Sequence, residues 1–274
     1  MQYEYFGAFK KLQNDLETFQ AEGYYDETLS EFMRDTSWQQ SWDVESLSEH
    51  VNENDHVIVD LGVGDGRLIK QLQDGGTNST FIGVDSSPSA RNRFLKRQEE
   101  CNFNGEFILA DFISDKIPLN NVDFVYFGAI SVNGLTTIKN VSKIFSNVER
   151  CMSSVGRFAI SVYTNSSVSR FPELNGILTP EIYTTESGKE RIIWRGLKYE
   201  APFLIHNSFI DRRSEGLEPV LCSHHERIWR EQDITEIANI LGWTVAYRNI
   251  SQVGDGGAQG YEVSTISFSK NDRQ

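Results

Sequence analysis

Residues 57–68 read VIVDLGVGDGRL, a strand pattern that runs into a glycine-rich turn. VIVDL is a short run of aliphatic and β-branched residues ending at turn residues, which predicts a buried strand. Gly62, Gly64 and Gly66 follow at alternate positions, and helix-forming sequence resumes after them. Glycine is used where the backbone needs a positive φ angle or where a ligand approaches it closely. We therefore predict a strand-to-helix turn that binds a ligand.

The sequence from residue 56 to residue 163 alternates strand patterns with helix patterns. Such alternation favours parallel βαβ units with helices on both faces of one sheet. From residue 231 a further helix precedes two strands that pair as a hairpin. We predict an α/β fold with a Rossmann-like, doubly wound sheet of seven strands, one of them antiparallel. The expected strands are 56–61, 80–85, 106–111, 122–129, 156–163, 244–250 and 261–269, and the expected helices are 66–73, 87–102, 137–154 and 231–243.

Two regions depart from this alternation. Helical periodicity in the first part of the chain predicts an N-terminal helical lid, with Asp43 as the N-cap of its last helix. Three longer strand patterns separated by turn signals predict an inserted antiparallel β-sheet. The expected division is a lid (1–55), a ligand-binding core (56–163), an insertion that covers the substrate (164–230) and a C-terminal completion of the core (231–274).

Composition and charge narrow the class of protein. The chain has 274 residues, 39% of them hydrophobic, which is enough to bury a large core. Its net charge of −13 opposes binding to nucleic acids and anionic membranes, because such binding needs Lys and Arg. Three distant cysteines indicate neither a disulfide framework nor a zinc site, and no run approaches the roughly 18 apolar residues of a membrane span. We expect a cytoplasmic protein without nucleic-acid or membrane partners, and we keep a homodimer as the candidate assembly.

Acidic residues around the glycines indicate the chemistry of the ligand. Asp60 precedes the glycines, and Asp65 lies between Gly64 and Gly66. The dinucleotide fingerprint GxGxxG has a different spacing and receives a pyrophosphate at a helix N-terminus. Two carboxylates would repel a pyrophosphate, so the pattern favours a ligand with an ammonium group.

The stretch Asp60-Leu-Gly62-Val-Gly64-Asp65-Gly66 resembles the first motif of the class I S-adenosylmethionine-dependent methyltransferases, D/E-x-G-x-G-x-G. The resemblance covers about residues 55–163 and 230–269. It implies S-adenosylmethionine as the cofactor and transfer of its sulfonium methyl group to a nucleophile.

Later motifs follow in the order of that family. The resemblance implies that Asp85, at the end of FIGVD, holds the ribose hydroxyls, and that Asp111 and Phe112 in FILADF contact the adenine. The segment VYFGAISVNGL would line the methionine end of the cofactor. Asp85 as a helix-start residue, Asp111 as a turn acid and Phe112 as a core residue remain the local alternatives. The implied cofactor-binding residues are Asp60, Gly62, Gly64, Gly66, Asp85, Ser86, Asp111, Phe112, Phe127 and Gly128.

The flanking regions resemble the lids of small-molecule N-methyltransferases, such as those that dimethylate amino sugars or methylate glycine. In general organisation they also resemble enzymes that dimethylate the terminal amine of modified, daptide-type peptides. The resemblance implies that Tyr24 or Tyr25 closes over the cofactor and acts as a catalytic residue. Packing of both tyrosines within a helix is the alternative.

Alternation along the last insertion strand sends His224 and Glu226 to one face, and His225 and Arg227 to the other. A histidine is a suitable acceptor for the proton of an amine or hydroxyl, and a nearby carboxylate raises its basicity. The resemblance favours His224 as the catalytic histidine; solvent-facing or structural histidines are the alternative. No further ligand stands at metal spacing, so we expect no metal site. The candidate acceptor-binding residues are Asn133, His206, Glu226 and Trp194, the last of which also suits a small core of the insertion.

These features predict a methyltransferase acting on an amine of a small molecule or peptide in bacterial secondary metabolism. A metal-free small-molecule O-methyltransferase is the first alternative. A non-catalytic partner protein that binds S-adenosylmethionine is the second.

Overall fold

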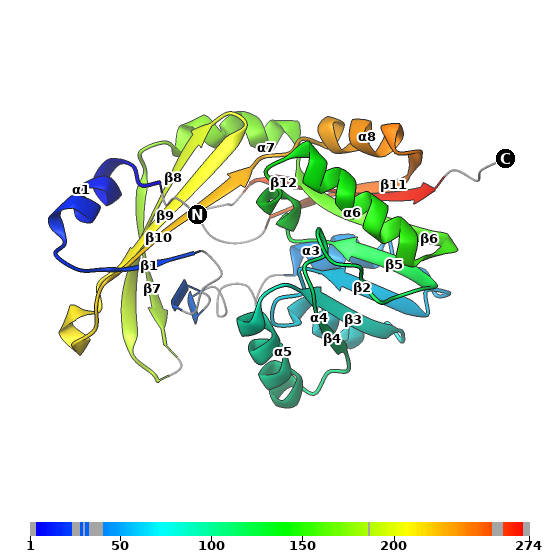
Figure 1. The fold of residues 1–274 in the computed structure, drawn as a ribbon, viewed down its shortest axis with the longest axis horizontal. Helices are drawn as coiled ribbons and strands as arrows, with labels where there is room; N and C mark the ends of the chain where they lie inside the picture. The colour runs from blue at the N-terminus through cyan, green and yellow to red at the C-terminus, as the bar shows by residue number, and fades with distance from the viewer. Residues whose placement is uncertain are drawn as a thin grey trace. The chain divides into compact units, whose positions relative to one another are not determined.

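The computed structural model describes residues 4–23, 28–29, 31–32, 41–185, 187–253 and 260–270. The chain divides into two compact units, whose elements are labelled in Figure 1. Unit 1 consists of residues 1–39 and 169–228, and unit 2 consists of residues 40–168 and 229–274. Each unit is described separately below.

Unit 2 contains a seven-stranded sheet in the order β11-β12-β6-β5-β2-β3-β4. Only β12 runs antiparallel to its neighbours, β6 and β11. This arrangement confirms the predicted Rossmann-like α/β fold. The strands are β2 (Val57–Leu61), β3 (Thr80–Asp85), β4 (Glu106–Leu109), β5 (Val122–Phe127), β6 (Met152–Tyr163), β11 (Trp243–Gln252) and β12 (Glu262–Lys270).

Helices connect these strands along the chain. Ser87 caps α5 by accepting a hydrogen bond from the backbone N–H of Ala90, and Pro88 occupies the first helical position, where its missing N–H has no cost. Asp43 lies inside α3, whose N-cap position is Ser41, so its predicted capping role is wrong. The helices are α3 (Trp42–Ser48), α4 (Arg67–Asp74), α5 (Pro88–Cys101), the short 3₁₀ helix η1 (Ser131–Gly134), α6 (Ile138–Cys151), α7 (Asn165–Arg170), which continues into unit 1, and α8 (Glu231–Ile240).

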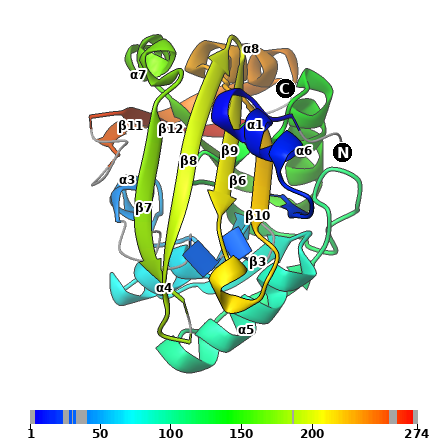
Figure 2. The same ribbon diagram turned by 90° about the vertical axis from the view of Figure 1, so that its left-hand side faces the viewer.

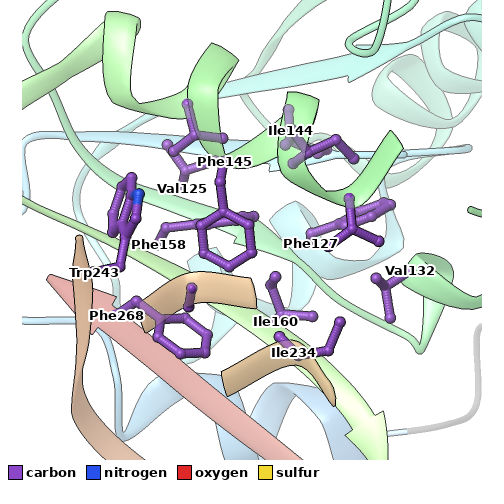
Figure 3. Close-up of a cluster of buried hydrophobic side chains, with 14 of the residues drawn as sticks. Val125, Phe127, Val132, Ile144, Phe145, Phe158, Ile160, Ile234, Trp243 and Phe268 are labelled. Atoms are coloured by element: carbon purple, nitrogen blue, oxygen red, sulfur yellow. The ribbon is translucent and has the colours of Figure 1, made fainter. Parts of the chain in front are cut away.

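The core of unit 2 lies between one face of its sheet and the helices α6 and α8. Phe145 of α6 is at its centre, with ring centroids 5.1 Å from Phe158, 5.5 Å from Trp243 and 5.5 Å from Phe268 (Figure 3). Because side chains alternate along each strand, neighbours such as Ile58 and Phe81 point to the other face and are also buried. The sheet is therefore covered on both faces, as a doubly wound fold requires.

Unit 1 contains a five-stranded sheet in the order β1-β10-β9-β8-β7. Three of its strands, β8 (Glu190–Glu200), β9 (Phe203–Ile210) and β10 (Val220–Arg227), match the predicted insertion strands and are antiparallel. The sequence predicts a helical region at the N-terminus, but part of it forms a strand, β1 (Gln20–Glu22), which pairs in parallel with β10. The edge strand β7 (Leu178–Thr184) was also missed, because Pro180 interrupts its strand pattern.

Helices and turns complete unit 1. Helix α1 (Gly7–Asp15) packs its buried Phe9 on one face of the sheet with Phe209 and Leu221, and Figure 2 shows α1 in front of β9 and β10. Leu29 and Phe32 pack on the other face. Two short 3₁₀ helices, η2 (Phe171–Leu174) and η3 (Arg213–Glu215), complete the unit. Among the described residues, no helix is long and apolar enough to cross a membrane.

Candidate functional site

The glycine-rich turn between β2 and α4 has the backbone conformation that its sequence predicts. Gly62, Gly64 and Gly66 have φ angles of +74°, +58° and +85°, which residues with a side chain rarely adopt. A Cβ atom on Gly66 would lie 2.6 Å from Phe103 and 2.9 Å from Phe94, so Gly66 is required for packing. A Cβ on Gly64 would meet nothing within 4 Å. The open space beside Gly64 is where a ligand can approach the backbone.

Asp85, at the end of β3, is tied to this turn. Its Oδ2 accepts a hydrogen bond from the backbone N–H of Gly64 at 3.0 Å, and its Oδ1 accepts one from Ser87 at 2.9 Å. Each carboxylate oxygen can accept a second hydrogen bond, so Asp85 retains capacity for two hydroxyl donors of a ligand. Ser86 is exposed beside it. The helix-start contact to Ser87 and a role in ligand binding are thus compatible.

Asp60 precedes the turn in a buried, electronegative environment. Burial raises the pKa of Asp60 well above its usual range; Arg67 lowers it, and Asp43 and Asp85 raise it further. Arg67 already donates from Nη1 to Asp43 Oδ1 at 2.9 Å and forms an ion pair with Asp43 Oδ2. The carboxyl groups of Asp43 and Asp60 therefore both act on one guanidinium, and a further cation would favour the ionised form of Asp60. These residues fit a ligand that carries an ammonium group.

Asp111 and Phe112 follow β4. Burial acts to raise the pKa of Asp111, but hydrogen bonds from Ser114 and from the backbone of Ile113 and Ser114 outweigh it and lower the pKa. Ser114 Oγ donates to Oδ2 at 2.7 Å and Ile113 N donates to Oδ1 at 2.9 Å. Phe112 is half-buried, with its ring centroid 5.2 Å from that of Phe127. Local turn contacts account for what the structure shows of Asp111.

The segment after β5 lies against the glycine-rich turn. A Cβ on Gly62 would lie 3.6 Å from the ring of Phe127, which is itself buried in the core of unit 2. Next to it, Ala129 and Ile130 have φ angles of +48° and +60°, an unfavourable conformation for residues with side chains. Such strain is often retained at functional sites. The structure therefore brings together two of the segments that the sequence assigns to the cofactor.

Asn133 lies in η1, beyond the strained residues, and is 2% exposed. Its Oδ1 accepts a hydrogen bond from the backbone N–H of Trp229 at 3.4 Å. Its Nδ2 has no hydrogen-bond partner among the residues that the structure describes. A buried, unsatisfied donor is costly, so Asn133 is suited to donate to an oxygen atom of a ligand.

Three of the predicted acceptor-site residues form one cluster in unit 1. Nε2 of His206 lies 3.3 Å from Oε2 of Glu226, and Nε2 of His224 lies 3.4 Å from Oε1. Burial acts to raise the pKa of Glu226, but the charge of His206 and the hydrogen bonds of both histidines outweigh it and lower the pKa. One ionised carboxylate therefore stands between two imidazoles.

The register of the unit 1 sheet separates Trp194 from this cluster. His224 pairs directly with His206, and His206 pairs with Leu197, so these side chains share a face. Trp194 pairs with Phe209 and is 43% exposed on the opposite face, which also carries α1. Trp194 cannot line the surface that the histidines line, and we do not carry it into the acceptor site. Tyr24 and Tyr25 lie outside the described residues.

Sequence reasoning missed two partners of the glycine-rich turn, Arg67 and Tyr126. Arg67 directly follows Gly66, but only the fold reveals its ion pair with Asp43. Tyr126 pairs in register with Asp60. The hydroxyl group of Tyr126 in an otherwise apolar strand pattern was the one sequence feature that could have indicated this role. Within the described ranges, no group of three or more His, Cys, Asp or Glu residues is arranged to hold a metal ion.

Comparisons with known proteins agree with this geometry. A family model described as "Methyltransferase domain" matches residues 52–194. A methyltransferase structure from Clostridium acetobutylicum, described as S-adenosylmethionine-dependent, superposes with a TM-score of 0.65 at 16% identity, covering 97% of this chain and 100% of that one. The sugar N-methyltransferase KedS8 from Streptoalloteichus superposes with a TM-score of 0.67 at 12% identity, covering 93% and 99%. These two likenesses show a shared fold.

Similarity in sequence to curated proteins covers a short segment of the chain. The tRNA (guanine-N(7)-)-methyltransferase of Mesomycoplasma hyopneumoniae is 34% identical over 64 residues. This segment is 23% of the present chain, and it covers only 32% of the length of that relative.

Proposed function

The chain belongs to the methyltransferase-domain family, a class I S-adenosylmethionine-dependent family, and we propose that it methylates an amine nitrogen of a small molecule or peptide. We place the reaction in bacterial secondary metabolism. The observation that supports a proton-accepting site is the cluster of His206, Glu226 and His224 in unit 1, and the likeness to the sugar N-methyltransferase KedS8 supports the choice of an amine.

The residues of unit 2 would hold the cofactor. S-adenosylmethionine supplies an electrophilic methyl group on a sulfonium centre. Asp60 is buried, and a nearby cation would stabilise its carboxylate, so it would face the ammonium group of the methionine end. Asp85 would accept hydrogen bonds from the ribose hydroxyls. Gly64 leaves its backbone accessible, and Phe112 would cover the adenine with Asp111 beside it.

The residues of unit 1 would bind the acceptor. An amine loses a proton when it is methylated, and a histidine held beside a carboxylate is a suitable proton acceptor. Glu226 would stabilise the imidazolium that forms on either His224 or His206. In unit 2, Asn133 would donate from Nδ2 to an oxygen atom of a ligand bound there. The neighbour KedS8, described as a sugar N-methyltransferase, supports an amine acceptor for this fold.

Methyl transfer to a panel of amines tests this proposal. The protein is incubated with methyl-labelled S-adenosylmethionine and with amino sugars, amino acids and peptides, each paired with its N-acylated form. We expect label in the free amines only. Transfer to hydroxyl groups in the acylated forms would instead favour the O-methyltransferase, and binding of S-adenosylhomocysteine without transfer to any acceptor would favour a non-catalytic protein.

Histidine variants test the role of the unit 1 cluster. With an accepted amine, His224→Ala and His206→Ala should each lower kcat about tenfold or more, and the double variant about 100-fold or more, within the range of general-base catalysis. Affinity for S-adenosylhomocysteine should stay unchanged. The matched control is His225→Ala, since His225 points to the opposite face of the sheet beside Glu4. Full activity of the double variant would exclude a histidine base.

A further inference from the structure

Polar side chains form a row across five neighbouring strands of the unit 2 sheet. Asn249 on β11 pairs with Thr265 on β12, and Thr265 pairs with Ser161 on β6. Tyr126 on β5 pairs with Asp60 on β2. We call these five residues the polar row. The opposite face of the same strands carries the apolar core drawn in Figure 3.

Hydrogen bonds connect four members of the row with Ser46 of α3. The distances are 3.4 Å from Tyr126 Oη to Ser161 Oγ and 3.1 Å from Ser161 Oγ to Thr265 Oγ1. Ser46 Oγ lies 2.7 Å from Thr265 Oγ1 and 2.8 Å from Asn249 Oδ1. Thr265 and Ser161 are fully buried, and Tyr126 is 1% exposed. Four members of the row and Ser46 are therefore connected by a continuous chain of hydrogen bonds inside the unit.

Asn249 anchors one end of this chain of hydrogen bonds. Its Nδ2 donates to Glu49 Oε2 and to the backbone oxygen of Ser46, both at 2.9 Å, so its Oδ1 faces the Ser46 hydroxyl. An amide oxygen only accepts, and a hydroxyl carries one hydrogen. The one hydrogen of the Ser46 hydroxyl is therefore within reach of two acceptors, Asn249 Oδ1 and Thr265 Oγ1. The hydroxyl contacts of Ser161 with Thr265 and with Tyr126 complete the chain.

Tyr126 stands at the far end of this chain, with its hydroxyl oxygen 3.4 Å from Ser161 Oγ. Burial first, and then the charge of Asp43, raise the pKa of Tyr126 above its usual range, so the phenol stays neutral. A Cβ on Gly128 would lie 1.8 Å from the Tyr126 hydroxyl oxygen, so the tip of the ring lies directly against the Gly128 backbone.

We propose that the polar row positions the two cofactor-binding turns of unit 2 relative to each other. Tyr126 is the positioning residue: it is paired with Asp60 before the glycine-rich turn and lies against Gly128 in the segment after β5. The hydrogen bonds through Ser161, Thr265 and Ser46 hold its side chain in place. This inference rests on the proposed function, because the two turns need fixed positions only if they bind a shared ligand.

The chemistry of the row favours positioning over packing. Buried hydroxyls are costly unless they are hydrogen-bonded. On the opposite face, apolar side chains such as Phe127, Val162 and Ile266 stand next to Tyr126, Ser161 and Thr265. A fully connected buried network specifies one arrangement of its members. Loss of one hydroxyl in the middle of the row should therefore loosen Tyr126 and weaken cofactor binding without removing any residue that touches the ligand.

Substitution of Thr265 tests the proposal. Thr265→Val keeps the shape of the side chain and removes the hydroxyl, whereas Thr265→Ser keeps the hydroxyl. The matched control is Ser264→Ala, because Ser264 is the adjacent residue on β12, is fully buried, points to the opposite face, and its hydroxyl has no partner among the described residues. Calorimetry measures the dissociation constant of S-adenosylhomocysteine, and thermal unfolding is recorded for every variant.

We expect Thr265→Val to weaken S-adenosylhomocysteine binding about fivefold or more, the effect of one lost hydrogen bond. Thr265→Ser and Ser264→Ala should bind within about twofold of the wild type. Tyr126→Phe, which keeps the ring against Gly128, should match Thr265→Val. If both Thr265→Val and Tyr126→Phe melt at lower temperature but bind as tightly as the wild type, the row is purely structural and the inference is wrong. Failure of the wild type itself to bind would instead overturn the proposed function, and this inference with it.

Discussion

Asp60 shows how one residue can be unfavourable for folding and suited to binding. It is buried beside Asp43 and Asp85, with Arg67 as the nearby cation, and Arg67 is engaged by Asp43. Folding therefore favours the protonated carboxyl group, whereas a bound ammonium group favours the carboxylate. Keeping the Asp60 carboxylate ionised therefore costs folding free energy, and a bound cationic ligand would reduce that cost.

The contribution of Asp60 to the stability of the fold depends on pH. Because the pKa of Asp60 in the folded protein is raised, its contribution to stability is fully present below the unfolded-state pKa and is lost as the pH rises through the folded-state pKa. Asp60→Asn should therefore raise the melting temperature at pH 8 by about 2–4 °C without ligand. It should also abolish the stabilisation by S-adenosylhomocysteine. The control is Glu53→Gln, an exposed change of the same charge. A lower melting temperature for Asp60→Asn at pH 8 would contradict this account.

At the scale of elements, two glycines in the turn between β2 and α4 have different roles. Gly66 is the N-cap of α4 and has no room for a side chain, because Phe94 and Phe103 occupy the space that a Cβ would need. Gly64 has that room and still carries no side chain. Gly66 is therefore needed for packing, whereas Gly64 keeps the backbone accessible beside Asp85.

Alanine substitutions distinguish these uses. Gly66→Ala should destabilise the protein by about 3 kcal/mol or more, because overpacking adds to the strain of a positive φ angle. Gly64→Ala should cost only about 1–2 kcal/mol but weaken S-adenosylhomocysteine binding about tenfold or more. Chemical denaturation followed by circular dichroism and titration calorimetry measure the two effects. Wild-type affinity in Gly64→Ala would mean that no ligand approaches this turn.

At the scale of the whole molecule, net charge bears on the choice of substrate. The curated relative reported above is a tRNA methyltransferase by name, and it aligns with 64 residues of this chain at 34% identity. The present chain carries 39 acidic residues against 26 lysines and arginines. Binding to a phosphate backbone relies on cations that release counterions, and the −13 net charge opposes it.

We therefore expect no tRNA methylation. Bulk tRNA with labelled S-adenosylmethionine should gain no label, and filter binding should show no retention at about 0.15 M salt, where non-specific affinity is already weak. A tRNA (guanine-N(7)-)-methyltransferase assayed in parallel provides the positive control. Saturable tRNA binding together with methyl incorporation would contradict the proposed amine acceptor.

Local patterns were sufficient to predict the order of strands and helices in unit 2, the positive φ angles of the glycine-rich turn and the shared face of His224 and Glu226. These features depend on side-chain periodicity and on the conformational range of glycine, and both can be read within a few neighbouring residues. The closeness of Asp85 to Gly64, though not their hydrogen bond itself, could also be predicted, since the carboxyl ends of adjacent parallel strands meet at one edge of a sheet.

Other features depended on contacts between distant parts of the chain. Ser161 meets Thr265 across 104 positions, and Ser46 meets Asn249 across 203. Similarly, the placement of Trp194 opposite the histidines followed from strand register, because the faces of two strands are matched only when the strands pair. Pairing partners are chosen by the packing of the whole unit, and a linear pattern does not contain that information. The polar row could therefore be recognised only in the folded protein.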